Sequence, residues 1–176
     1  EQFNWLTSEL LASTAKFKVV VTTAPLTDYT SSGIFVAGWT QFPTQRNALV
    51  SHIVDNTILG VLFVAGNTQF SSYGMVNLTK SADQNSTWSV RNVTELVAGP
   101  VGTYINPQIL FNPKIALGVG QVSMLDSWST STVNLNPVTG NVTMRWHNDY
   151  GKVMLEQVVP YYPETVPLYS NATRKQ

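Results

Sequence analysis

Gly60-Val-Leu-Phe-Val-Ala-Gly-Asn-Thr-Gln-Phe-Ser-Ser72 is the stretch that decides the fold. Its first half is a short apolar run, rich in β-branched and aromatic residues and bounded by glycines, which is typical of a buried strand over 61–65. Its second half is a polar loop at the C-terminal end of that strand, where open α/β sheets place their ligands. The loop carries Asn67 and Gln69. Neither side chain titrates, so the loop stands where a site is expected without offering an acid or a base.

The residues before this stretch predict two helices and one further strand. Apolar positions at helical spacing favour an amphipathic helix over 2–15 and a second over 44–56, the latter opened by Pro43. Between them, a β-branched run predicts a strand over 17–23 that Pro25 closes, followed by a polar loop over 26–40. Strand, helix and strand form a βαβ-like unit, so the strands over 17–23 and 61–65 are expected to be parallel neighbours.

The residues after it predict strands and turns alone. Strands are expected over 73–78, 88–90, 94–98, 115–123, 129–135, 141–147 and 152–159. Turn residues over 136–141 and 147–151 predict hairpins between the last three. The fold class is therefore α/β in the α+β sense: a helix-strand-helix-strand unit followed by a β-rich half with hairpins. Residues 1–159 are expected to form one domain, and the proline-containing residues 160–176 an extended arm or linker.

The composition excludes several classes of function. Charged residues make up 11% of the 176 residues, against about 25% in typical soluble proteins, and the net charge is zero. Because no basic stripe is present, nucleic acid is not an expected partner. The chain has no cysteine, so it has neither disulfides nor thiolate metal ligands. No apolar run approaches the roughly 18 residues of a membrane span.

Five sequons for N-glycosylation indicate a secreted or cell-surface glycoprotein. Their acceptors are Asn77, Asn85, Asn92, Asn141 and Asn171, and none has a proline in the middle position. A chain rich in Asn, Ser and Thr produces some sequons by composition alone. These five lie in or beside predicted turns and loops, where acceptors must be accessible. N-linked glycans are the only attached groups expected, and they would help keep a chain with few charges soluble.

Two histidines are the remaining candidate ligands. His52 lies beside the apolar face of the predicted helix over 44–56, with no second His or acidic residue at ligand spacing. His147 falls on the polar face of a predicted strand, at its end. Both are interpreted as structural or surface residues rather than metal ligands.

An ordered series of short motifs resembles the C-terminal half of the PhoD-like alkaline phosphatase and phosphodiesterase family of metallophosphoesterases. The series is Gln2-x-x-Trp5-Leu6, Phe17-Lys18-Val19-Val20-Val21, Gly38-Trp39, Phe42-Pro43-x-x-Arg46-x-x-Leu49, Gly60–Gly66 and Glu95-Leu96-x-x-Gly99-Pro100. It covers roughly residues 1–125, with a hairpin continuation to about 159. The resemblance implies part of an αββα sandwich, so that 1–159 would be a C-terminal half-domain.

The resemblance also implies a two-metal phosphoesterase site and shows where this chain departs from it. In the family, the strand that matches 61–65 is followed by Gly-Asp-x-His, and the His is a metal ligand. Here Gly66-Asn67-Thr68-Gln69 follows, and neutral amides are weak ligands for transition metals. The family's other ligands belong to an N-terminal half that precedes the matching region, so two metal ions are expected only if such a half restores the site.

A half-sandwich would expose an apolar sheet face, which a soluble monomer does not tolerate. Three partners can cover it: the N-terminal half of the same polypeptide, further copies of this chain, or a strand or arm swapped from a neighbour. Open edges with a head-to-tail arm favour a polymer.

The leading hypothesis is a pseudoenzyme: a non-catalytic, secreted, N-glycosylated structural or assembly protein that forms filaments or a surface layer. An alternative is the C-terminal part of an active PhoD-like metal-dependent phosphatase. A second alternative is a carbohydrate-binding module, prompted by Trp39, Trp88, Trp128 and Trp146.

Overall fold

The structure is a computed structural model that describes residues 1–29, 37–76, 93–100, 122–124 and 128–160. Its helices are α1 (Gln2–Ala12) and α2 (Pro43–Asp55), with a short 3-10 turn, η2 (Trp39–Gln41), before α2. Its strands are β1 (Lys18–Thr22), β2 (Val61–Ala65), β3 (Ser71–Val76), β4 (Val93–Val97), β5 (Val122–Met124), β6 (Ser129–Asn136), β7 (Asn141–Asn148) and β8 (Val153–Pro160).

The strands form two sheets. Sheet A has the order β1-β2-β4-β3-β5, and sheet B is the antiparallel series β6-β7-β8. In sheet A, β1, β2 and β4 are parallel to one another, whereas β3 is antiparallel to β4 and to β5. The predicted parallel pairing of the strands over 17–23 and 61–65 is thus confirmed, with Lys18 opposite Val61 and Thr22 opposite Ala65.

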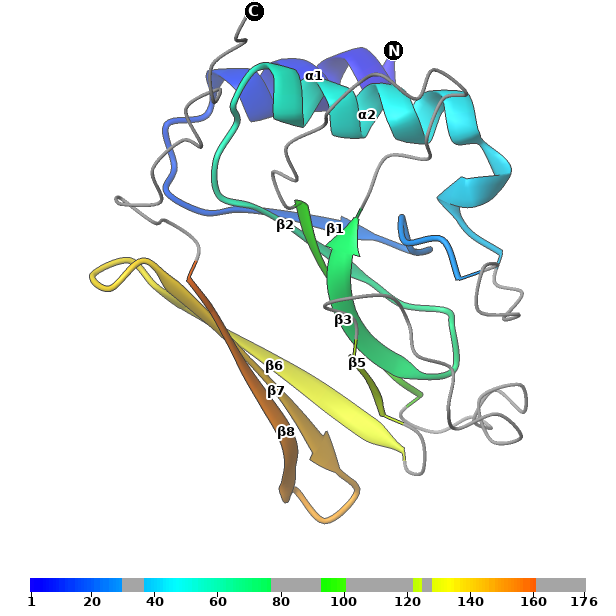
Figure 1. Ribbon diagram of the computed structural model, residues 1–176, viewed down its shortest axis with the longest axis vertical. Helices are drawn as coiled ribbons and strands as arrows, with labels where there is room; N and C mark the ends of the chain where they lie inside the picture. Colours follow the sequence, from blue (N-terminus) through cyan, green and yellow to red (C-terminus); the bar gives the residue numbers. More distant parts are fainter. Residues whose placement is uncertain (30–36, 77–92, 101–121, 125–127, 161–176) are drawn as a thin grey trace, which may run out of the picture.

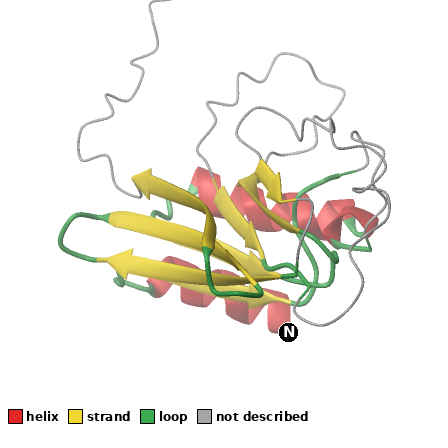
Figure 2. Cartoon of the chain, turned by 90° about the horizontal axis from the view of Figure 1, so that it is seen from below, coloured by secondary structure: helices red, strands yellow, loops and turns green. Residues whose placement is uncertain are grey.

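Three layers result, in the order helices, sheet A, sheet B (Figure 1). Helices α1 and α2 pack on one face of sheet A, where Leu10, Leu49 and Ile53 meet Phe63 and Val93 in one apolar cluster. In the view of Figure 2 the strands lie in front of both helices. The α+β class is confirmed, and the layers correspond to three of the four in an αββα sandwich.

The opposite face of sheet A is covered, which corrects the expectation of an open apolar face. Leu62 and Leu96 are completely buried there against Val142, Met144 and Trp146 of sheet B. The reason is the alternation along β7, which points every second residue inward as an apolar row. The hairpins of this chain therefore supply the second sheet that a half-sandwich was expected to lack. The coverage stops at β1, where Val19 and Val21 stay exposed.

Most sequence expectations agree with these elements within a few residues. The strand expected over 61–65 agrees in both bounds, and the hairpin turns lie where expected. The helix expected over 2–15 ends at Ala12, because Ser13 is already extended, with a ψ of 124°. The strand expected over 88–90 and the arm after Pro160 lie outside the described residues, as does most of the strand expected over 115–123.

Candidate functional site

The loop after β2 lies at the carboxyl edge of sheet A, as the sequence predicts. Thr68 is buried, and its hydroxyl donates to the carbonyl of Phe70 at 2.7 Å. This contact folds the loop inward at Thr68, while Asn67 is exposed and Gln69 half-buried. Neither amide side chain makes a hydrogen bond to the part of the chain that the structure describes. The two candidate positions therefore lie at the carboxyl edge of sheet A, and both carry uncharged side chains.

The backbone of this loop is strained. Asn67 has φ 63° and Gln69 has φ 61°, both in the left-handed region that favours glycine. Asparagine tolerates this region better than glutamine does, because its short side chain can bond locally. Such outliers persist where the surrounding structure fixes them, and they cluster at ligand sites.

The only charged side chain on β4, Glu95, lies at the same edge but is fully internal, with 1% of its surface exposed. Its two carboxylate oxygens accept hydrogen bonds from the backbone N–H groups of Leu26 at 2.6 Å and of Thr27 at 2.9 Å. Burial raises the pKa of Glu95, and the hydrogen bonds and the nearby charge of Arg46 oppose that rise. The carboxylate fastens the loop after β1, because each of its oxygens accepts a backbone hydrogen bond from that loop.

Arg46 of α2 completes this cluster. It is 2% exposed, and its Nε donates to the carbonyl of Leu26, so the Leu26 residue is held between opposite charges. Burial lowers the pKa of Arg46, while the charges of Glu95 and Asp28 raise it. A buried charge is tolerated when it is hydrogen-bonded and lies near an opposite charge. Arg46 and Glu95 meet these conditions through their hydrogen bonds to the loop backbone and through their mutual attraction.

Tyr29 ties the same loop to β3. Its hydroxyl lies 2.7 Å from the Ser72 hydroxyl, and its ring meets that of Phe70 edge-to-face with centroids 5.1 Å apart. Burial and the charge of Glu95 both raise the pKa of Tyr29, so the phenol stays neutral. We call Tyr29, Arg46, Ser72 and Glu95, with the Leu26–Thr27 backbone, the edge cluster.

Glycine at position 99 allows sheet B to dock at this edge. The Ser71 and Ser129 hydroxyls lie 2.5 Å apart, and a Cβ on Gly99 would overlap the first and stand 2.6 Å from the second. The start of β6 thereby reaches the start of β3.

The structure separates the other sequence candidates from this site. His52 is half-buried and its Nε2 lies 3.0 Å from the carbonyl oxygen of Thr7, so it joins the two helices. His147 lies on the outward face of β7, with its Nε2 3.1 Å from the Thr132 hydroxyl. Both contacts agree with the structural interpretation of these histidines. Within the described ranges, no three His, Asp or Glu side chains gather closely enough to hold a metal ion.

The tryptophans divide between core and surface. Trp146 is completely buried against Tyr73, and Trp39 donates its indole N–H to the Thr22 hydroxyl at 3.2 Å. Trp128 is half exposed, and Trp88 lies outside the described residues. A row of aromatic rings for sugar stacking therefore does not arise from Trp39 and Trp146.

Only one of the five sequon acceptors lies in the described part. Asn141 begins β7, next to the hairpin turn, on the outward face that Thr143 and Arg145 share. Asn77, Asn85, Asn92 and Asn171 lie outside the described residues.

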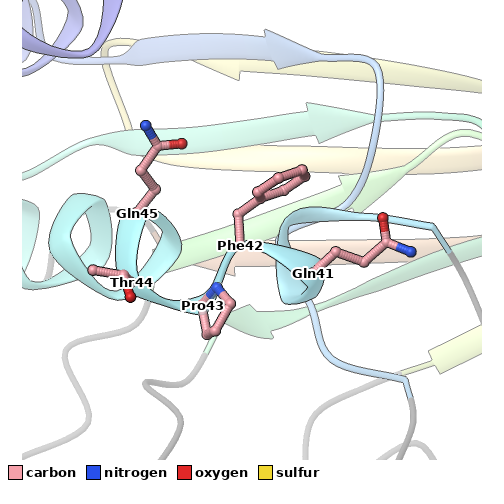
Figure 3. Close-up of a pocket in the computed structure, with 5 residues that line it drawn as sticks. All are labelled: Gln41, Phe42, Pro43, Thr44 and Gln45. Atoms are coloured by element: carbon pink, nitrogen blue, oxygen red, sulfur yellow. The ribbon is translucent and has the colours of Figure 1, made fainter.

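An open hollow lies at the start of α2, lined by Gln41, Phe42, Pro43, Thr44 and Gln45 (Figure 3). All five are consecutive in the chain and none is ionisable, so no groups from different elements converge there. The hollow includes neither Asn67 nor Gln69.

The family model for PhoD-like phosphatase matches residues 1–154. The chain belongs to the PhoD-like phosphatase family. The chain is also similar to a solved structure described as "Structure of PhoD", at 19% sequence identity and a TM-score of 0.48, over 90% of this chain and 34% of that one. It thus spans about a third of the length of that PhoD chain. No curated protein matches it. In the described residues, no helix has the length and apolar character needed to span a membrane.

Sequence reasoning missed the edge cluster. The signal was present, because Glu95 interrupts an apolar strand and Arg46 lies among Leu49 and Val50 in a chain with few charges. Only the fold shows that Arg46 and Glu95 lie close together, since they are far apart in the sequence.

Proposed function

We propose that this chain is a non-catalytic, secreted, N-glycosylated structural or assembly protein built on the PhoD-like scaffold. The observation that carries the proposal is the chemistry of the carboxyl edge. The loop positions hold the amides of Asn67 and Gln69, and the carboxylate of Glu95 is occupied by backbone donors. These groups do not fit the metal ions of a two-metal phosphoesterase, which prefer imidazole and carboxylate.

Secretion and glycosylation are supported by the sequons and by the surface at Asn141. The outward face of sheet B carries Thr130, Thr132, Asn134 and Thr143, whose side chains are polar and uncharged. A glycan on Asn141 would lie on this face, on which the Arg145–Glu156 pair supplies the charges. Treatment of the secreted protein with an N-glycosidase should lower its mass, and Asn141→Gln should remove one glycan. An unchanged mass would contradict this part of the proposal.

The absence of catalysis is tested by metal analysis and turnover together. The secreted protein, at whatever length it is isolated, is dialysed against Zn²⁺ or Mn²⁺, analysed for bound metal and assayed with a chromogenic phosphodiester. We expect no tightly bound metal and no turnover above buffer. Two tightly bound metal ions, with turnover lost in an Asn67→Ala/Gln69→Ala variant, would overturn the proposal.

A second candidate is favoured by the family match itself: the C-terminal part of an active PhoD-like phosphoesterase whose other ligands lie elsewhere in the polypeptide. On this account the strained loop would still face a substrate. The sequence of the messenger RNA upstream of the Glu1 codon separates the two. Intact metal motifs there, together with turnover by the longer protein, would establish the enzyme.

Assembly is tested by electron microscopy of the purified protein. Filaments or a two-dimensional layer are expected, and free monomers alone at high concentration would refute assembly. A glycan-array screen tests the carbohydrate-binding alternative, and saturable binding that Trp128→Ala abolishes would favour it.

A further inference from the structure

We propose that β1 is a self-complementary docking edge at which a second copy of this chain pairs antiparallel with β1, so that two A sheets become continuous. The inference deepens the assembly part of the proposed function and rests on it. It names the surface and the occupant, which the proposed function leaves open.

One side of the β1 backbone faces no other strand of the described residues. In the described residues β1 pairs with β2 alone, which makes it an edge of sheet A. The N–H of Lys18 donates to the Gly60 carbonyl at 2.7 Å, so the Lys18 backbone faces β2. Because backbone groups alternate sides along a strand, Val19 and Val21 direct their N–H and C=O groups toward the open edge.

The side chains of these two residues form an apolar strip. Val19 is 46% exposed and Val21 is 78% exposed, on the same face as their neighbours Leu62 and Val64. Leu62 is completely buried by sheet B. Val19 and Val21 extend the same apolar face of sheet A past the edge of sheet B, so they remain exposed. A pairing strand would bring further side chains over this strip.

Edge strands of soluble proteins usually carry a device against pairing, such as an inward lysine, a proline or a bulge. Strand β8, an edge of sheet B in the described residues, has two. It ends in Pro160, and its pairing with β7 contains a register shift beside His147. In β1 the only charge is Lys18, whose Nζ is bound to the carbonyls of Ala15 and Leu59. The ammonium group of Lys18 is therefore bound within its own chain and is not directed against a strand that pairs with β1.

The sequence of β1 matches itself in the antiparallel direction. With Val20 opposite Val20 of the second copy on a two-fold axis, Val19 of each copy faces Val21 of the other. These are the residues whose backbone groups point outward, so each such pair can exchange both N–H···O=C bonds. Lys18 then faces the neutral Thr22, and no like charges are opposed. Such an isologous contact closes as a dimer.

The contact is short, so the dimer is expected to be weak by itself. Two five-residue strands bury less than the roughly 1,600 Å² of a standard stable interface. Dimerisation should therefore depend on concentration in the range of about micromolar and above.

Cysteine pairing reads out the register directly, because the chain has no cysteine of its own. Single variants Val19→Cys and Val21→Cys of the glycosylated, secreted protein are oxidised with diamide, separately and mixed. In the proposed register the thiol introduced at position 19 of one copy faces the thiol introduced at position 21 of the other. The Cα atoms of such a pair are about 5.5 Å apart, which suits a disulfide.

Identical variants place their thiols diagonally across the two-fold axis, with Cα atoms about 7–8 Å apart. The mixture should therefore form far more cross-linked dimer than either variant alone. Equal cross-linking in all three samples would overturn the proposal.

A charge on the edge gives an independent test. Val21→Lys should weaken dimerisation at least about tenfold in sedimentation equilibrium, because it removes the apolar pair and adds charge. Val138→Lys is the matched control, since Val138 is 90% exposed in the β6–β7 turn. Unchanged self-association in Val21→Lys would refute β1 as the surface, while filaments in the same sample would leave the proposed assembly function standing. Metal-dependent turnover would refute the non-catalytic function but would leave the cross-linking result unaffected.

Discussion

Two groups of polar residues lie along the same edge of sheet A and have opposite characters. The edge cluster holds two buried charges, and each of them is hydrogen-bonded to backbone groups of the loop after β1. The loop after β2 holds two amides that make no hydrogen bonds with the described residues. The chain thus uses two of its few charges to fix the shape of the edge, whereas the loop after β2 carries the neutral side chains of Asn67 and Gln69.

Removing Glu95 should cause the largest loss of stability. Glu95→Ala leaves Arg46 and the N–H groups of Leu26 and Thr27 buried without this carboxylate. Leaving a buried donor unsatisfied costs about 1–3 kcal/mol for each group, and the loss is measured as the free energy of unfolding in urea. Glu156→Ala is the control, because the exposed pair with Arg145 is worth about 0–1 kcal/mol. Equal losses of unfolding free energy in Glu95→Ala and Glu156→Ala would mean that the edge cluster contributes no more to stability than an exposed ion pair.

Two glycines test how tightly the edge is packed. In Gly99→Ala the new Cβ meets the Ser71 and Ser129 hydroxyls, and overpacking of this kind costs about 1–3 kcal/mol. In Gly66→Ala nothing lies within 4 Å of the new Cβ, so the free energy of unfolding should change by less than about 0.5 kcal/mol. Thermal melts of the two variants give the comparison. A larger loss in Gly66→Ala would mean that the loop, and not the docking of β6, is the packed part.

The pH dependence of stability should carry the signature of Glu95. Burial raises its pKa in the folded chain above the value of about 4.3 in an unfolded chain. The folded state therefore binds this proton more tightly, so the contribution is fully present below about pH 4.3 and is lost as the pH rises through the folded pKa. Subtracting the unfolding free energies of Glu95→Gln from those of the wild type should leave a difference that falls with rising pH. A difference that rises with pH would show that hydrogen bonding outweighs burial at Glu95.

The smallest expected effect concerns the strained loop. Gln69→Gly should stabilise the chain by up to about 1 kcal/mol, since glycine adopts the positive φ of this position without a steric cost. Asn67→Gly should gain less, because asparagine already tolerates the left-handed region. Chemical denaturation of both variants measures the difference. Destabilisation by Gln69→Gly would mean that the half-buried glutamine side chain contributes more than its backbone costs.

Sequence patterns predicted the elements but not their contacts. The strand over 61–65 and the hairpins of β6, β7 and β8 followed from local patterns of apolar residues and turns. The motif series also identified the family that the match over residues 1–154 shows. What failed was the expectation of an open sheet face, because no local pattern states which face of a sheet a later hairpin will cover. The edge cluster was missed for the same reason, as Arg46 and Glu95 meet only after β1, α2 and β4 are assembled.

The sequence by itself determined that the loop after β2 carries Asn67 and Gln69, since residue type and the position after a strand are local properties. Tertiary structure alone decided that Glu95 is structural, that sheet B covers Leu62 and Leu96, and that Val19 and Val21 stay uncovered. The physical reason is that burial depends on segments that are distant in the chain. Burial in turn sets the free-energy cost of a charge and decides whether an apolar strip is exposed. Residue types set the chemical groups that are available, and tertiary packing decides which of them are buried and which are exposed.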